Sequence, residues 1–290
     1  MNMIDSSTIK NSVTSLISKH SGKIPLIEIE LLLCRILKCA REDIYVCDHT
    51  LSRDAEDLYD EFVRRRLAGE PLQYIIGKAD FMGINFVVNK DVFIPRPETE
   101  LLVEAVLSLV SGSASGRKEG LKILDLCTGC GNIGISLAML IPGVEVIAVD
   151  ISEAALEIAR KNSLIHRVDK SITFYKGSLF HAIPVDKKNK FDIIVCNPPY
   201  IKKGELDSLQ KEVRYEPAVA LDGGADGLEM YREIAKYAPG YLRHGGSLFL
   251  ELGFGQSRGT IELFSEDIYK IREVKKDFSG IERVLWIDLL

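Results

Sequence analysis

The chain has 290 residues, 46% of them hydrophobic, and a formal net charge of −5. That length is sufficient for a substantial core and two domains, and no apolar run approaches the ~18 residues that span a membrane. The acidic balance argues against extensive binding of nucleic-acid phosphates. The start of the chain lacks the features of a signal or transit peptide, and the six cysteines form no disulfide framework, so we expect a cytoplasmic protein.

The N-terminal region has the apolar spacing of amphipathic helices. The spacing holds over residues 6–20, 26–38 and 54–69, which predicts a small helical bundle. Residues 74–95 alternate in polarity, with glycines as breaks, and predict a β-hairpin connector. A helix is expected over 98–110. We therefore expect a helical substrate-recognition domain at 1–73, a connector at 74–96 and a larger domain at 97–290.

Strands and helices alternate in the rest of the chain. The predicted strands are 122–126, 145–150, 172–175, 191–196, 247–251, 271–277 and 283–288. The predicted helices are 133–140, 152–162, 229–238 and 257–264. This order predicts an α/β fold, with a doubly wound seven-stranded sheet whose last hairpin is antiparallel. Ligands of such sheets bind at the carboxyl ends of the strands.

A glycine-rich loop follows the first strand of this sheet. Gly129 and Gly131 permit a tight strand-to-helix turn and let a ligand approach the backbone closely. Asp150 ends the next strand, 19 positions after Gly131, where a βαβ nucleotide-binding unit places its ribose-binding acid. The loop therefore indicates a nucleotide-like cofactor.

Two kinds of cofactor compete for this loop. Gly129, Gly131 and Gly134 form the GxGxxG pattern of dinucleotide-binding enzymes. However, Asp125 ends the first strand beside the position of a pyrophosphate, and the two negative charges would repel. S-adenosylmethionine carries a positive sulfur, an ammonium group and no phosphate, so the sequence favours it over NAD.

The tetrapeptide Asn197-Pro198-Pro199-Tyr200 comes directly after the apolar strand 191–196. Two consecutive prolines end a strand in a rigid turn because neither has a backbone N–H. The side-chain amide of Asn197, the carbonyl of Pro198 and the ring of Tyr200 are thus directed to a common point. This arrangement suits a planar NH2 group, although a proline-terminated strand with an ordinary loop has the same sequence pattern.

Several motifs together resemble the release-factor glutamine N(5)-methyltransferase family. The resemblance covers most of the chain, in Gln73–Gly77, Phe93–Glu100, the glycine loop, Asn197–Ile201, Tyr215–Pro217, Ala220–Leu228 and Leu250–Gly253 with Gln256. It implies a class I methyltransferase that transfers a methyl group from S-adenosylmethionine to a glutamine side-chain nitrogen and leaves S-adenosylhomocysteine. The implied substrate is the Gly-Gly-Gln loop of class 1 peptide chain release factors, which act in translation termination.

The resemblance also assigns site residues. The implied catalytic and substrate-binding residues are Asn197, Pro198, Pro199 and Tyr200. The implied cofactor-binding residues are Phe93, Arg96, Pro97, Cys127, Thr128, Gly129, Cys130, Gly131, Asp150, Leu179 and Asn197. Asp150 can instead cap the following helix, and Arg96 can instead form an interdomain salt bridge.

The chain departs from the family at two of these positions and at Ser178, which precedes Leu179. The family usually has Gly and Ser or Thr where this chain has Cys127 and Cys130, and it often has Asp where this chain has Ser178 before Leu179. A Cys-x-x-Cys pair without a second pair or paired histidines is not a zinc site, so we expect no metal. Backbone contacts to the cofactor survive such changes, but a side-chain contact from position 178 to the adenine is in doubt.

The residues also suggest a mechanism. If Asn197 Oδ1 and the Pro198 carbonyl each accept one N–H, the amide nitrogen is held with its lone pair toward the methyl group. Those hydrogen bonds strengthen as the nitrogen gains positive charge in the transition state. Tyr200 would pack against the amide plane. No covalent intermediate is needed.

Other functions compete with this one. A ribosomal-protein glutamine poses the same chemistry, and a nucleic-acid base presents a similar NH2 group. A non-catalytic scaffold that binds the cofactor is disfavoured by the intact Asn197 and glycine loop. The helical domain would hold the rest of a protein substrate. The cluster Arg64–Arg66 is expected to pair with Asp60 and Glu61, or else to contact an acidic partner.

Overall fold

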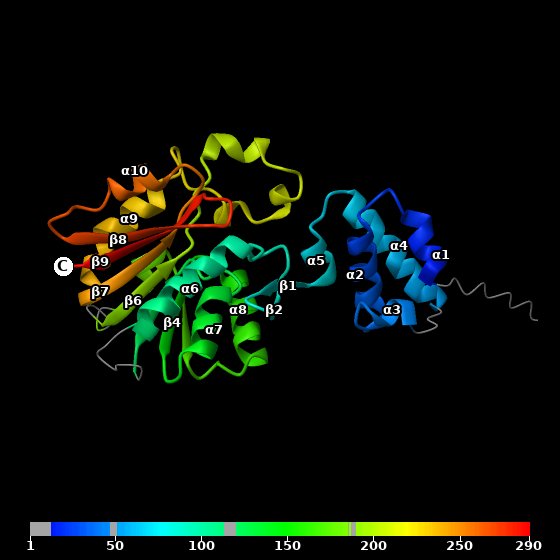
Figure 1. The fold of residues 1–290 in the computed structure, drawn as a ribbon, viewed down its shortest axis with the longest axis horizontal. Helices are drawn as coiled ribbons and strands as arrows, with labels where there is room; N and C mark the ends of the chain where they lie inside the picture. Colours follow the sequence, from blue (N-terminus) through cyan, green and yellow to red (C-terminus); the bar gives the residue numbers. More distant parts are fainter. Residues whose placement is uncertain (1–12, 47–50, 113–119, 185, 187–189) are drawn as a thin grey trace, which may run out of the picture. The chain divides into compact units, whose positions relative to one another are not determined.

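The computed structural model describes residues 13–46, 51–112, 120–184, 186 and 190–290. The chain forms two compact units (Figure 1). The helical unit extends to Gly77 and also includes the distant segment Lys211–Tyr215, and the sheet unit comprises Lys78–Gln210 and Glu216–Leu290. Among the described residues, none of the helices has the length and apolar run that crossing a membrane requires.

The helical unit is a small bundle around one apolar core. Its helices are α1 (Val13–His20), α2 (Leu26–Leu37), α3 (Asp43–Val46), α4 (Arg53–Leu67) and α5 (Leu72–Ile76). Leu32, Leu33 and Tyr59 are among its fully buried side chains. Ser52 caps α4 by accepting a hydrogen bond from the Ala55 N–H. Residues 6–12 of the first predicted helix lie outside the described residues.

The predicted connector is helical at its start. Residues 74–76 belong to α5, which begins after Pro71 and ends at Gly77 in a left-handed conformation with φ of 79°. A short apolar run does not distinguish a helix from a strand by its period alone. The hairpin consists of β1 (Lys78–Phe81) and β2 (Ile84–Val87), joined by a turn at Met82 and Gly83 that has positive φ at both positions.

The sheet unit contains the predicted seven-stranded sheet. The strand order is β5-β4-β3-β6-β7-β9-β8, and β9 is antiparallel to both of its neighbours. The strands are β3 (Lys122–Leu126), β4 (Glu145–Asp150), β5 (Ile172–Lys176), β6 (Phe191–Cys196), β7 (Leu242–Glu251), β8 (Tyr269–Lys276) and β9 (Glu282–Leu289). The predicted fold is confirmed. Among the strands, the largest difference between predicted and observed bounds is in β7, which begins at Leu242 instead of at residue 247.

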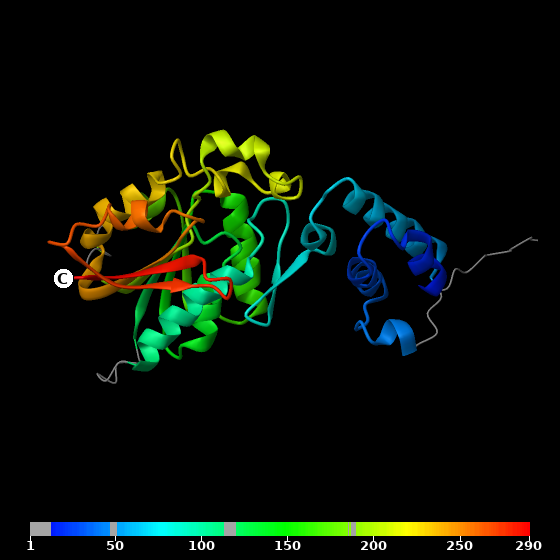
Figure 2. The same cartoon turned by 45° about the horizontal axis from the view of Figure 1, so that its top comes forward.

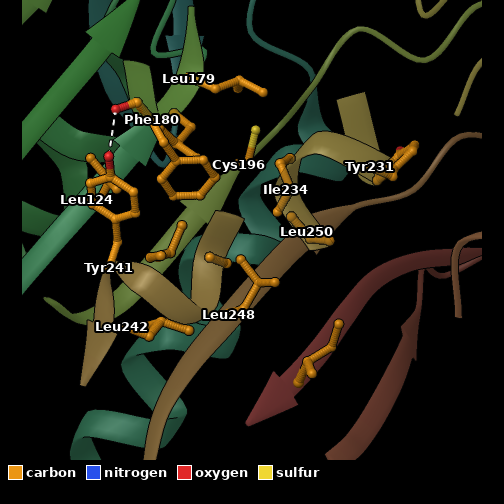
Figure 3. Close-up of a cluster of buried hydrophobic side chains, with 14 of the residues drawn as sticks. Leu124, Leu179, Phe180, Cys196, Tyr231, Ile234, Tyr241, Leu242, Leu248 and Leu250 are labelled. Carbon is orange, nitrogen blue, oxygen red and sulfur yellow. Dashed lines mark hydrogen bonds between the residues drawn. The ribbon is translucent and has the colours of Figure 1, made fainter. Parts of the chain in front are cut away.

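Helices cover both faces of this sheet (Figures 1 and 2). They are α6 (Pro97–Gly112), α7 (Asn132–Leu140), α8 (Glu153–Ile165), α9 (Glu229–Tyr237) and α10 (Ser257–Ile261). On the α9 face, alternate strand residues such as Leu124, Ile194 and Leu248 pack with Tyr231 and Ile234 in one apolar cluster (Figure 3). Burial on both faces explains the nearly continuous apolar runs of β3 and β6.

Candidate active site

The glycine loop connects β3 to α7 in a strained conformation. Cys127 has a φ of 58°, and Gly129 and Gly131 have φ of 55° and 86°. An L-residue rarely adopts the left-handed region, so Cys127 costs conformational energy where glycine would not. A Cβ at Gly129 would meet no heavy atom within 4 Å, so open space borders the loop there.

The Asp125 side chain anchors this loop through two hydrogen bonds. Its Oδ2 accepts hydrogen bonds from Thr128 Oγ1 at 2.6 Å and from the Gly134 N–H at 3.0 Å. Gly134 must be glycine because a Cβ would lie 2.8 Å from the same oxygen. Complete burial raises the pKa of Asp125 to about 7. An acid that is partly neutral near pH 7 repels a phosphate only weakly, so the charge of Asp125 does not exclude a dinucleotide.

Asp150 connects the glycine loop to the start of α8. Its Oδ2 accepts the Gly129 N–H at 2.8 Å, and its Oδ1 accepts the Ser152 N–H at 2.9 Å. The cap of α8 is Ser152, whose side chain accepts the Ala155 N–H at 3.2 Å. Each carboxylate oxygen can accept a further hydrogen bond, as ribose hydroxyls require. The Asp150 carboxylate therefore keeps acceptor capacity beside the glycine loop.

The cysteines near the loop are thiols in apolar surroundings. Cys130 is 1% exposed, and burial raises the pKa of its thiol to about 12. Burial and the neighbouring Cys127 raise the pKa of the Cys196 thiol well above its usual value. Thiols held protonated are poor nucleophiles and poor metal ligands. In the described part of the chain, no His, Cys, Asp and Glu side chains gather in a group of three or more that could hold a metal ion.

Leu179 lies at the same edge of the sheet, after β5, but its side chain is turned into the protein. It is 6% exposed, and it belongs to the apolar cluster of the α9 face (Figure 3). Its φ of 44° is another left-handed position. Any border that Leu179 forms with an adenine therefore comes mainly from its backbone.

The segment before α6 contains a pair of stacked and charged groups. The Arg96 guanidinium lies 4.6 Å from the centroid of the Phe93 ring and forms an ion pair with Glu216. Glu216 also accepts the Ile94 N–H at 3.0 Å. Arg96 therefore forms a salt bridge, the alternative considered for it, and this pair lies within the sheet unit. Pro97 is the exposed first residue of α6.

Glu216 is a residue whose place could not be read from the sequence. It is 5% exposed, and burial raises its pKa although Arg96 lowers it. In the sequence, Glu216 is marked only as part of the motif Tyr215–Pro217, which carries the family resemblance and assigns it no partner. Its partners lie 120 and 122 positions away, which no local pattern reveals.

The turn after β6 presents two oxygens. The Nδ2 of Asn197 donates to Thr99 Oγ1 at 3.3 Å, which leaves Oδ1 on the other side of the amide. Among the described residues, no hydrogen bond reaches Asn197 Oδ1 or the Pro198 carbonyl. Neither Asn197 nor Tyr200 is fully buried. In the described part of the chain, these two acceptors are thus free of protein donors, and Pro198 itself is buried.

The glycine-rich segment 222–227 and Gln256 hold the turn that follows Asn197 in place through hydrogen bonds. Ile201 donates its N–H to the Leu221 carbonyl at 3.0 Å and accepts the Gly223 N–H at 2.8 Å. The Gln256 Nε2 donates to the Tyr200 carbonyl at 2.8 Å. A Cβ at Gly223 would lie 2.7 Å from the Tyr200 Cα. Close approach of the Tyr200 backbone explains Gly223 and Gly227, whereas Gly224 has a positive φ of 86°.

The arginine cluster of α4 is largely paired inside the helical unit. Arg65 binds Glu70 at 2.6 Å, and Arg66 binds Glu28 at 2.5 Å and Glu212 at 2.8 Å. The predicted pairing with Asp60 and Glu61 is therefore wrong, because Arg65 and Arg66 form their ion pairs with other glutamates. Asp60 is bound to Lys19 instead.

Comparison with known proteins gives two family matches, a methyltransferase domain over residues 117–237 and the PrmC N-terminal domain over residues 10–77. The chain is 36% identical to the release factor glutamine methyltransferase of Thermodesulfovibrio yellowstonii, over 95% of this chain and 96% of that protein. It is 40% identical to that of Geobacter sulfurreducens, over 89% of this chain and 88% of that protein. A methyltransferase structure from Pyrococcus furiosus has a TM-score of 0.50 at 17% identity, covering 81% of this chain and 97% of that one. This last likeness concerns the fold alone.

Proposed function

Because this chain belongs to the release factor glutamine methyltransferase family, we propose that it methylates the glutamine of the Gly-Gly-Gln loop in class 1 peptide chain release factors. The methyl donor is S-adenosylmethionine, as in other methyltransferase domains. The side-chain amide nitrogen of the glutamine receives the methyl group. The resemblance drawn from the motifs is thereby confirmed at the level of the family.

The observation that supports this proposal is the pair of unpartnered acceptors at Asn197 and Pro198. An amide nitrogen is a poor nucleophile because its lone pair is delocalised into the carbonyl. Two acceptors that each take one N–H orient the nitrogen and stabilise the positive charge that develops on it. The half-buried Tyr200 ring is suited to pack against the amide plane.

The reaction needs little else from the protein. The bound cofactor supplies a methyl group on a positively charged sulfur. The glutamine nitrogen forms the new N–C bond with its lone pair, the electrons of the broken S–C bond stay on sulfur, and one N–H proton leaves to water. Asn197 and Pro198 would hold the nitrogen facing the methyl group, and positioning of reacting atoms at about 3–3.5 Å removes much of the entropic barrier.

The proposed cofactor contacts follow from the same edge of the sheet. The backbone from Cys127 to Gly131 would hold the methionine part, and Asp150 the ribose hydroxyls. Phe93, Arg96 and Pro97 would approach the ligand from the segment before α6. Arg96 is already paired with Glu216, so we propose that it holds Phe93 in place. The helical unit would bind the remainder of the release factor.

An assay with labelled methyl donor tests the function. The protein is incubated with a purified class 1 release factor, with total ribosomal protein and with bulk nucleic acid in separate reactions, and the label is mapped by mass spectrometry. We expect the label on the Gly-Gly-Gln glutamine, and none on a factor whose glutamine is replaced by alanine. Label confined to nucleic acid or to a ribosomal protein would overturn the proposed substrate.

The variant Asn197→Ala tests the site. We expect its affinity for S-adenosylhomocysteine, measured by calorimetry, to stay within about twofold of that of the wild type. Its turnover should fall by about a hundredfold or more, because a transition-state acceptor is lost. Turnover close to that of the wild type would remove Asn197 from the mechanism.

A further inference from the structure

Glu251 lies beside Asn197 without having been assigned a role by any motif. It is the last residue of β7, and the parallel register places Cys196 opposite Leu250. Asn197 directly follows β6 and Glu251 ends β7, so the two residues lie side by side at the carboxyl edge of the sheet. Glu251 is only 2% exposed, so its carboxyl group stands almost entirely outside solvent.

The surroundings of this group restrict the Asn197 amide. Burial raises the pKa of the Glu251 carboxyl group, whereas the polar side chains of Thr99 and Asn197 lie near it and lower that pKa. Asn197 Nδ2 donates to Thr99 Oγ1 at 3.3 Å. An amide nitrogen only donates and an amide oxygen only accepts, so Glu251 in its ionised form, which only accepts, selects one of the two amide orientations. In the opposite orientation, Asn197 Oδ1 would face the acceptor oxygens of Glu251.

We propose that Glu251, together with Thr99, is a positioning residue that locks the Asn197 amide with Oδ1 directed at the substrate nitrogen. The inference rests on the proposed function, since it concerns the acceptor that this function requires. Glu251 touches neither substrate nor cofactor in this proposal and acts only through Asn197. Thr99 belongs to the Ile-Pro-Arg-Pro-Glu-Thr-Glu segment, which gives that segment a task at the reaction centre.

The cost of this arrangement argues against a purely structural role. Among the described residues, no hydrogen bond partner reaches Glu251 Oε2, although the atom is buried. Buried polar atoms without partners destabilise a fold, and apolar residues of similar volume often stabilise it. A group that costs stability at the edge of an active site is typical of residues kept for function.

The variant Glu251→Leu distinguishes a positioning role of Glu251 from a purely structural role. We expect kcat with the release factor to fall by at least about tenfold, because the amide is free to turn. Donor affinity should stay within about twofold, and the urea midpoint of unfolding should be equal or higher. Glu251→Gln, which keeps one acceptor oxygen, should recover part of the lost kcat. The matched control is Val284→Ala, the buried partner of Glu251 on β9, which should lower stability and leave kcat unchanged.

A double-variant cycle then tests whether Glu251 acts through Asn197. Adding Glu251→Leu to Asn197→Ala should cause no further loss of kcat, because there is no amide left to orient. Losses that multiply, or wild-type kcat in Glu251→Leu, would overturn the inference while leaving the proposed function intact. Wild-type kcat in Asn197→Ala would instead refute the proposed site.

Nuclear magnetic resonance gives a readout that does not depend on turnover. The side-chain NH2 signal of Asn197 is identified by its disappearance in Asn197→Ala. In the wild type we expect its protons to exchange slowly with solvent, and in Glu251→Leu the exchange should accelerate by at least about tenfold. Unchanged exchange and an unchanged chemical shift would show that the carboxyl group does not hold the amide.

Discussion

Buried carboxyl groups are the residues that distinguish this site from an ordinary sheet edge. Burial raises the pKa of Asp125 and of Glu251 to about 7 and also raises the pKa of Asp150 and Glu216. An acid with a raised pKa binds its proton more tightly in the folded than in the unfolded protein. Its contribution to stability is therefore present at low pH and is lost as the pH rises from about 4 to about 7.

The variant Asp125→Asn should flatten this pH dependence. The wild type should lose unfolding free energy between pH 5 and pH 8, and the variant should lose less by an amount on the order of 1–3 kcal/mol, because Asn cannot ionise. Urea denaturation at the two pH values measures the difference. Asp226→Asn is the control, because the pKa of the exposed Asp226 is lowered to about 2 by Arg232 and its ionisation lies outside this range. An equal loss of unfolding free energy between the two pH values in Asp125→Asn and in the wild type would contradict the raised pKa of Asp125.

At the scale of elements, the substrate corner depends on a segment that follows it by about twenty residues. The turn is held by an isolated β-bridge between Ile201 and Asp222 and by the side chain of Gln256. Position 223 admits only glycine, because the Tyr200 backbone occupies the space of a Cβ. The geometry of the catalytic turn is thus set by segments that contribute no reacting group.

The variant Gly223→Ala should displace the turn and lower turnover by an amount on the order of tenfold to a hundredfold, since small misplacements of reacting groups have effects of this size. Gly204→Ala is a matched control in the same loop, because a Cβ at Gly204 meets nothing within 4 Å. Steady-state kinetics with the release factor measures both. Equal turnover in the two variants would show that the corner tolerates the shift.

At the scale of the whole molecule, the two units are not divided at a single point of the chain. The segment Lys211–Tyr215 belongs to the helical unit, although both of its flanks belong to the sheet unit. Arg66 joins it to the bundle through Glu212, while also binding Glu28 of α2. The Tyr215 hydroxyl donates to the Ala68 carbonyl at 3.3 Å. The predicted boundaries at 73 and 96 did not anticipate this return of the chain.

The variant Arg66→Met should lower the stability of the helical unit by about 1–3 kcal/mol, because Glu28 and Glu212 both lose their ion-pair partner. Hydrogen exchange of the α2 and α4 amides measures this local stability. Arg64→Met is the control on the same helix, because Arg64 is exposed and should change stability by no more than about 0.5 kcal/mol. Equal hydrogen exchange in the two variants would show that Arg66 does not stabilise the helical unit.

Prediction from the sequence succeeded where the signal is local. The strand–loop–helix at 122–140, the acid at the end of β4 and the proline turn after β6 were all placed, because each depends on neighbours within a few residues. It failed at residues 74–76, where a short apolar run fits two periods, and at the partners of Arg65 and Arg66, which lie on other segments. The assigned cofactor contacts stay predictions.

The sequence by itself determined the class of fold, the family and the identity of the groups at the carboxyl edge of the sheet, because alternating elements and short motifs carry that information along the chain. Only the tertiary structure decided which oxygens are free and which side chains hold them. Asn197 meets Thr99 across 98 positions, and Arg96 meets Glu216 across 120. Contacts over such separations depend on strand order and register, which the packing of the complete sheet establishes.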